Sequence, residues 1–212
     1  MRRVIILSAA ALISISVAGC ADTEPGEALP HGNSSQSSAA PSNSLSFPSE
    51  LDVGSYMDRP CDVLSPELLE SRGYPIEGQK LEETGPAGQR LSELTGPSCS
   101  WGAKETTHAQ VLSVSLIDQP SRGSEAVLNG VRERHRSGVL QLWEEVEVAG
   151  YPAAYYGLRD NRDRGDCAMM VAVSGTAIVT VNAGPYMDDP RQACVDVDEF
   201  VTDLIDNLQK GV

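Results

Sequence analysis

Five cysteines constrain this chain of 212 residues more than any other feature, because covalent bridges would fix which segments lie together. Cys20 lies near the N-terminus, and the other four are far apart in the sequence, at Cys61, Cys99, Cys167 and Cys194. None of them forms the close C-x-x-C pair that is typical of zinc sites. An exported chain would reach an oxidising compartment, where four cysteines predict two disulfides.

The first 19 residues have the three parts of a secretory signal peptide. Arg2-Arg3 is the basic start, residues 4–17 are mainly apolar, and the small pair Ala18-Gly19 precedes Cys20. The apolar run is shorter than the roughly 20 residues that a membrane-spanning helix needs. A cysteine in this position is similar to the bacterial lipobox, in which the thiol receives a diacylglyceryl group and becomes the mature N-terminus.

We therefore predict that Cys20 carries lipid and holds the protein on the extracytoplasmic face of the cell membrane. The alternative is an ordinary cleaved signal peptide that an incidental cysteine follows. Residues 20–50 would then comprise the lipidated cysteine and a disordered tether. The tether is predicted because Ser, Pro, Ala, Gly and Asn dominate this stretch and no apolar periodicity appears. Residues 51–212 have the length and composition of a single domain.

The strong negative charge of the chain excludes some partners. The formal charge is −14, and loss of Arg2 and Arg3 with the signal peptide takes it to about −16. Such a surface repels the phosphates of nucleic acids, so we expect no nucleic-acid partner. It also repels anionic lipid headgroups, so attachment to the membrane should depend on the N-terminal acyl chains.

Hydrophobic periodicity predicts three helices in the domain. The last, over residues 189–210, is the clearest, since Val197, Val201 and Leu208 fall on one stripe and acidic residues lie off it. Two others are predicted over residues 66–73 and 121–136. Residues 76–97 are rich in Gly, Pro and Glu, and they predict an irregular loop.

Alternating or continuous apolar runs predict six strands, at residues 99–101, 112–116, 145–148, 152–157, 167–173 and 177–181. Ser174-Gly175 has the length of a tight turn between the last two. Strands that short turns join form antiparallel sheets. We therefore expect an α+β fold with an antiparallel sheet of about five to six strands and the helices packed on one face.

Four domain cysteines allow three pairings, and we predict the bridges Cys61–Cys99 and Cys167–Cys194. Each of these pairs joins segments that should already be neighbours. The first would pin the irregular segment after the first helix, and the second would clamp the last helix to a central strand. The crossed pairings would close longer loops and gain little more in chain entropy, so entropy alone does not decide.

The sequence contains no recognisable catalytic motif. A G-x-S-x-G nucleophile elbow and a phosphate-binding glycine loop are absent from it, and the domain has only two histidines, His108 and His135. Asp160, Asp163 and Asp166 recur at every third residue, but a calcium loop spaces its ligands differently and two arginines between them would balance their charge. We expect no enzyme activity, no metal and no cofactor, although a pair of carboxylates that acts on glycans stays open as an alternative.

The candidate ligand-binding residues are Trp143, Tyr155 and Tyr156, because exposed aromatic side chains often anchor recognition. The alternative is that these rings fill the core. The function we expect is a tethered binding or sensor module, with an unknown small ligand or an envelope protein as its partner. Two alternatives are a structural partner in an envelope complex and a hydrolase that acts on envelope components.

Several short motifs resemble one protein family. They occur in the order Pro60-Cys61-Asp62-Val63-Leu64-Ser65, Cys99-Ser100-Trp101, Gly150-Tyr151-Pro152-Ala153, Cys167 and Cys194. This order resembles the actinobacterial exported lipoproteins catalogued as domain of unknown function 3558, over residues 55 to 210. In that family the last cysteine tends to follow the proline directly, whereas Cys194 comes four residues after Pro190. The resemblance implies an exported, lipid-anchored protein and implies no activity.

Overall fold

The computed structural model describes residues 45–104 and 110–211, so Cys20, His108 and most of the predicted tether lie outside the described residues. The described residues form an α+β domain on one antiparallel sheet, which confirms the predicted fold class. The sheet has seven strands, slightly more than the five to six expected. The additional strand is β1, which is only two residues long.

The strands follow one another across the sheet in the order β1-β2-β3-β7-β6-β5-β4, and all neighbours are antiparallel. Their bounds are β1 (Gln79–Lys80), β2 (Ser98–Gly102), β3 (Val111–Asp118), β4 (Leu142–Val148), β5 (Tyr151–Gly157), β6 (Cys167–Ala172) and β7 (Ala177–Gly184). The longest pairing joins β3 to β7, two strands that are far apart in the chain.

Four α-helices accompany this sheet in the described part of the chain: α1 (Pro66–Ser71), α2 (Pro86–Thr95), α3 (Ser124–Arg136) and α4 (Gln192–Lys210). α4 begins three residues later than the sequence predicts. α2 lies where the sequence predicts an irregular loop, so that prediction is wrong. Its sequence hides the helix because Pro86 and Gly88 are poor helix formers, and its two leucines, Leu91 and Leu94, are both exposed.

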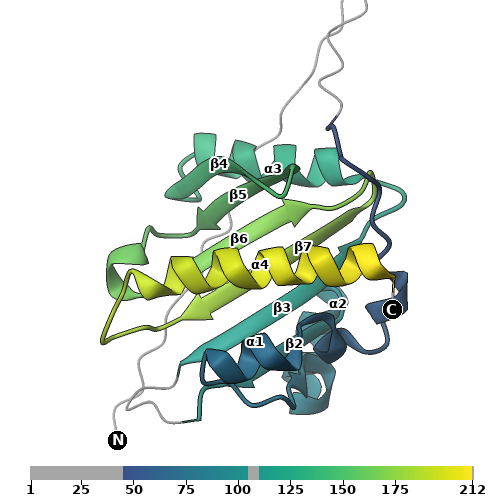
Figure 1. Ribbon diagram of the computed structural model, residues 1–212. Coiled ribbons are helices and arrows are strands. Elements are labelled where there is room, and N and C mark those ends of the chain that lie inside the picture. The colour runs from purple at the N-terminus through teal and green to yellow at the C-terminus, as the bar shows by residue number, and fades with distance from the viewer. Residues whose placement is uncertain (1–44, 105–109, 212) are drawn as a thin grey trace, which may run out of the picture. The chain divides into compact units, whose positions relative to one another are not determined.

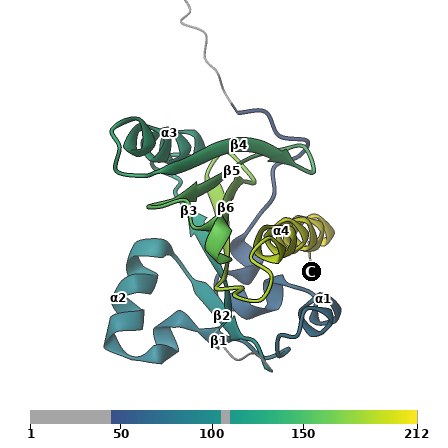
Figure 2. The same ribbon diagram turned by 90° about the vertical axis from the view of Figure 1, so that its left-hand side faces the viewer.

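The main core lies between the sheet and α4, which crosses the front of the sheet in Figure 1. α4 contributes a fully buried stripe that includes Phe200, Val201 and Leu204. The strands contribute every second residue to this core, as in Leu112 and Val114 of β3, because side chains alternate between the two faces of a strand. α1 lies on the same side (Figure 2).

α3 packs on the opposite face of the sheet, so the expectation that the helices gather on one face is wrong (Figure 2). Leu128 of α3 belongs to a second, smaller core with Ala154, Met170, Ala172 and Ile178. The reason lies in β6, which is apolar on both faces. A strand of that kind needs cover on both sides.

The two disulfides are those that the sequence predicts. Cys61 is bonded to Cys99 with their Cα atoms 5.1 Å apart, and Cys167 is bonded to Cys194 with their Cα atoms 5.2 Å apart. The first bridge holds the segment before α1 against β2. The second ties the first residue of β6 to the first turn of α4, and so fixes the helix on the sheet.

Residues 45–51 pack on the domain, although the composition predicts that the tether continues to residue 50. Phe47 contacts both cores, and Ser49 hydrogen-bonds Tyr151 at 2.9 Å between the two hydroxyl oxygens. Glu50 accepts a hydrogen bond from the backbone N–H of Gly175 at 2.6 Å. The packed part of the chain therefore reaches six residues further toward the N-terminus than the predicted domain boundary.

Candidate functional site

The three aromatic residues that the sequence singles out do not form one site. Tyr155 and Tyr156 are adjacent on β5 and therefore point to opposite faces of the sheet. Tyr155 packs toward α4, whereas Tyr156 and Trp143 contact the smaller core on the α3 side. Of the three, Tyr156 lines a cleft.

Tyr155 is part of a local network of charges. Its hydroxyl donates to Asp198 of α4, and the guanidinium of Arg162 lies 5.9 Å from its ring centroid. Burial raises the pKa of the Tyr155 hydroxyl, and the nearby Asp198 carboxylate raises it further. Arg162 also pairs with Glu144 at 2.7 Å and with Asp160 at 2.8 Å. These contacts are satisfied within the domain, so they favour a structural role for Tyr155.

Trp143 is also held by neighbours of the domain itself. Its indole N–H donates to Glu145 at 2.8 Å, and the guanidinium of Arg132 on α3 lies 5.9 Å from its ring centroid. Arg132 and Glu145 form an ion pair at 2.6 Å. The hydrogen bond from Trp143 and the contact with Arg132 lower the pKa of the Glu145 carboxyl. This arrangement ties β4 to α3.

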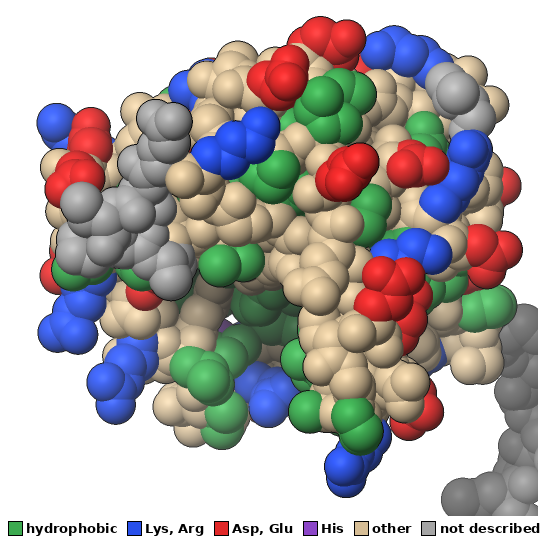
Figure 3. Space-filling view, turned by 90° about the horizontal axis from the view of Figure 1, so that it is seen from below, with side chains coloured by type: hydrophobic (Ala, Val, Ile, Leu, Met, Phe, Trp, Pro, Cys, Tyr) green, Lys and Arg blue, Asp and Glu red, His purple; other side chains and the backbone are tan. Residues whose placement is uncertain are grey.

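A broad concave surface lies on the α3 side of the sheet. α2 and α3 cover the two ends of this face and leave its middle without a helix (Figure 2). A cleft of about 550 Å³ lies there, and it brings together the first residues of β3 and β6 with the last residues of β5 and β7. Seen from below, the surface of the molecule is hollowed between two lobes (Figure 3). We name this site the open-face cleft.

The floor of the open-face cleft is polar but uncharged. Ser113 of β3, Asn182 of β7 and Tyr156 of β5 all line it. The Tyr156 hydroxyl lies 3.4 Å from the Asn182 side-chain oxygen, and burial raises the pKa of that hydroxyl, so it stays protonated at neutral pH. Neutral donors and acceptors of this kind orient a ligand without charge.

Apolar and charged side chains surround that floor. Leu158 and Val111 are apolar residues of the lining that stay 68% and 41% exposed. Arg159 and Asp166 add one charge of each sign. The aspartate is the last member of the Asp160, Asp163 and Asp166 triplet, and its place directly before Cys167 is the sequence signal that puts it beside the sheet.

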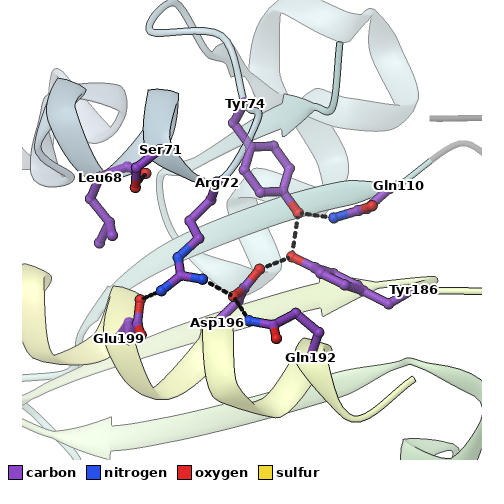
Figure 4. Close-up of polar contacts among 9 residues, drawn as sticks. All are labelled: Leu68, Ser71, Arg72, Tyr74, Gln110, Tyr186, Gln192, Asp196 and Glu199. Carbon is purple, nitrogen blue, oxygen red and sulfur yellow. Dashed lines mark hydrogen bonds and ion pairs between the residues drawn. The ribbon is translucent and has the colours of Figure 1, made fainter. Parts of the chain in front are cut away.

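A second polar cluster lies on the α4 side, where α1, β7 and α4 meet (Figure 4). Asp196 of α4 is its centre, and only 2% of this residue is exposed. Its carboxylate accepts hydrogen bonds from Tyr186 at 2.7 Å and Gln192 at 2.6 Å, and it pairs with Arg72 at 3.3 Å. Arg72 also pairs with Glu199. A buried carboxylate needs several such partners to offset its desolvation.

The hydrogen bonds in this buried cluster have one direction. The Tyr186 hydroxyl has a single proton, which it donates to Asp196, so the Tyr74 hydroxyl must donate to Tyr186 at 2.8 Å. Gln110 donates in turn to Tyr74 at 3.0 Å. Burial raises the pKa of both tyrosine hydroxyls, which keeps these protons in place. We interpret the cluster as a structural clamp.

Within residues 45–104 and 110–211, no group of three or more His, Cys, Asp or Glu side chains is placed to hold a metal ion. No helix of this described part is long and apolar enough to cross a membrane. His135, one of the two domain histidines, lies half-buried on α3 and does not line the open-face cleft.

Fold and site together define a disulfide-bonded α+β domain with a cleft on one face of its sheet. The chain belongs to the family described as "Protein of unknown function (DUF3558)", whose model matches residues 15–207. This match confirms the family that the sequence motifs indicate. Comparisons with curated proteins and with solved structures gave no match.

Proposed function

We propose that this protein is a lipid-anchored extracytoplasmic binding module and that the open-face cleft is its ligand site. The cleft is the observation that carries the proposal. Its volume of about 550 Å³ lies within the range of roughly 300–1,000 Å³ that is usual for small-molecule sites. It also combines exposed apolar side chains with a few neutral polar groups, the mixture that such sites typically have.

The position of the N-terminal segment supports this proposal. Residues 45–51 meet the domain at the turn between β6 and β7, where Leu51 N–H donates to the Val173 carbonyl at 3.0 Å. The cleft uses the other end of the same two strands, at Ala168 and Asn182. About five residues, or roughly 17 Å, separate the two ends. The polypeptide that leads to Cys20 therefore joins the domain away from the cleft.

The lining of the cleft favours binding over hydrolysis. A serine nucleophile needs a base in contact with it, usually a histidine. Ser113 is a serine of the cleft, and the lining residues within 45–104 and 110–211 include no histidine. Cys167 also lines the cleft, but its sulfur is bonded to Cys194.

The site is tested by filling the cleft. Ala168 is a half-buried lining residue of β6, and a phenylalanine there would occupy part of the cavity. Full-length protein in detergent is incubated with a small-molecule extract of cell envelopes, and native mass spectrometry records the bound molecules. We expect the unaltered protein to retain a ligand and Ala168→Phe to lose it.

The matched control is Ala126→Phe, which adds the same bulk to an exposed position of α3 outside the cleft. We expect this variant to retain the ligand. The proposal is wrong if no molecule is retained, or if Ala168→Phe retains as much as Ala126→Phe while both keep the thermal midpoint of the unaltered protein.

The anchor is tested separately through Cys20. Replacement by serine removes the thiol that would accept the diacylglyceryl group, so Cys20→Ser should leave the membrane fraction or accumulate as uncleaved precursor. Membrane fractionation and intact mass measure both outcomes. A Cys20→Ser protein that still fractionates as a mature, lipid-bearing form contradicts the anchor.

A further inference from the structure

The open-face cleft has two charged side chains, and neither is neutralised by the protein. Arg159 and Asp166 both line the cleft and are both exposed. Among residues 45–104 and 110–211, no ion pair involves either of them. Arg162, only three residues after Arg159, pairs with two carboxylates at once. The loop between β5 and β6 therefore satisfies one arginine internally and leaves another for the cleft.

Asp166 is held in place by its surroundings. Its backbone N–H donates to the Asn161 carbonyl at 3.2 Å, and the next residue, Cys167, is fixed to α4 by its disulfide. The side-chain Oδ1 atom of Asp166 lies so close to Gly184 of β7 that a Cβ atom on Gly184 would come within 2.3 Å of it. The absence of a side chain at Gly184 thus provides the space that the carboxylate occupies.

The position of Arg159 is set by a close contact between its own backbone and Gly157. A Cβ atom on Gly157, the last residue of β5, would come within 2.6 Å of the Arg159 carbonyl oxygen. The chain therefore folds back against the strand end and keeps residue 159 beside the cleft. Two charges of opposite sign thus line one cavity together with the neutral side chains of Ser113 and Asn182.

We infer that the ligand of this cleft is a small zwitterion with an apolar body, such as an amino acid or a short peptide; the inference rests on the proposed function. Its carboxylate would pair with Arg159, and its ammonium group with Asp166. Leu158 and Val111 would contact its apolar part. A ligand with one charge would satisfy one residue and meet a like charge at the other, so the site discriminates against it.

Four leucine dipeptides that differ only at their ends test the charge requirement. They are leucyl-leucine, its N-acetyl form, its C-terminal amide, and the form that carries both blocking groups. At pH 7 they are a zwitterion, an anion, a cation and a neutral molecule. Calorimetric titration of the full-length protein measures each affinity. We expect the zwitterion to bind roughly three- to ten-fold more tightly than either singly charged form, since exposed ion pairs are modest in strength.

Charge-neutral variants assign each end of the ligand. Arg159→Gln should remove the advantage of the zwitterion over the cationic amide, and Asp166→Asn should remove its advantage over the N-acetyl anion. Arg164→Gln and Asp163→Asn are matched controls, because these two exposed neighbours do not line the cleft. Both controls should keep the preference of the unaltered protein.

The outcomes separate this inference from the proposed function. Equal binding by the four dipeptides, tighter binding by a neutral or singly charged one, or no binding by any of them overturns the zwitterion assignment. The cleft itself is judged independently by Ala168→Phe and the envelope extract. A ligand that is retained there but carries no paired charges would uphold the binding function and contradict the ligand class.

Discussion

The two faces of the sheet use the same strands for different purposes. On the α4 side, β3 presents Leu112 and Val114, which are both fully buried in the main core. On the other side the same strand presents Ser113 and Ser115 to a face that no helix covers at its middle. One face gives the domain its stability, and the other leaves neutral polar groups at the base of a cleft. We therefore expect substitutions on the α4 face mainly to lower stability, and substitutions in the cleft mainly to lower ligand affinity.

The largest loss of stability is expected on the α4 face. Phe200→Ala removes a fully buried aromatic ring and should lower the free energy of unfolding by about 3–5 kcal/mol. Denaturant unfolding with the disulfides intact measures it. Leu128→Ala, in the smaller core under α3, should cost less, about 2 kcal/mol. If Leu128→Ala costs more than Phe200→Ala, the α3 side holds the dominant core and the comparison is reversed.

The second disulfide, Cys167–Cys194, lies on the α4 face, and its Cys167 also lines the cleft. Replacing Cys167 and Cys194 together by alanine should cost about 2–4 kcal/mol. The same change at Cys61 and Cys99 should cost a similar amount, since the sequence separations of 27 and 38 residues give similar loop entropies. Denaturant unfolding compares the two pairs. Only the Cys167–Cys194 bridge adjoins the cleft, through Asp166 and Ala168, so only its loss should also weaken ligand binding. Equal weakening of ligand binding by the two double replacements would contradict this link.

The buried clamp predicts a loss of stability at high pH. The pKa of the Tyr186 hydroxyl is raised above the ordinary value of 10.0, with burial as the main cause. A folded-state pKa above the unfolded one gives stability that is complete below about pH 10 and is lost as pH rises beyond it. Tyr186→Phe removes the titrating hydroxyl and should cost about 1–3 kcal/mol at pH 7, because Asp196 loses a donor.

Unfolding free energies at pH 7 and at pH 10.5 measure both effects. The variant should lose less stability than the unaltered protein over this interval. Tyr56→Phe is the control, because Tyr56 is buried in the same core but takes no part in the clamp. An identical pH dependence in Tyr186→Phe and the unaltered protein would contradict the role of this hydroxyl.

The sequence predicted those parts of the fold that local patterns determine. The apolar stripe of Val197, Val201 and Leu208 predicted α4, and the alternation of apolar and polar residues in β3 predicted a half-buried strand. The disulfide pairing followed because each bridge joins segments that pack together. α3 was placed on the wrong face because its own stripe, with Leu128, suits either side of a sheet. The two-sided apolar pattern of β6 was the signal that demanded a second covering layer.

The cleft was harder to foresee because its residues come from five strands. Val111, Tyr156, Asp166 and Asn182 meet only through the pairing of β3 with β7 and of β6 with its neighbours, which single-strand patterns do not specify. Of the three aromatic residues predicted to bind a ligand, Tyr156 lines the cleft, whereas Trp143 and Tyr155 share only its aromatic chemistry. Adjacent residues of a strand face opposite sides, so that grouping never described one surface.

The smallest effect on stability is expected at the floor of the cleft. Ser113 is half-buried, and Ser113→Ala should change the free energy of unfolding by no more than about 0.5 kcal/mol. Its hydroxyl is free to hydrogen-bond a ligand, and loss of one such bond is worth about 0.5–1.5 kcal/mol, or roughly two- to ten-fold in affinity. Ser100→Ala on β2 is the control, since Ser100 points to the same side but does not line the cleft. Denaturant unfolding and titration with the ligand retained by the unaltered protein measure the two quantities. A Ser113→Ala protein that loses several kcal/mol of stability and keeps its affinity would show that this face, too, serves the core.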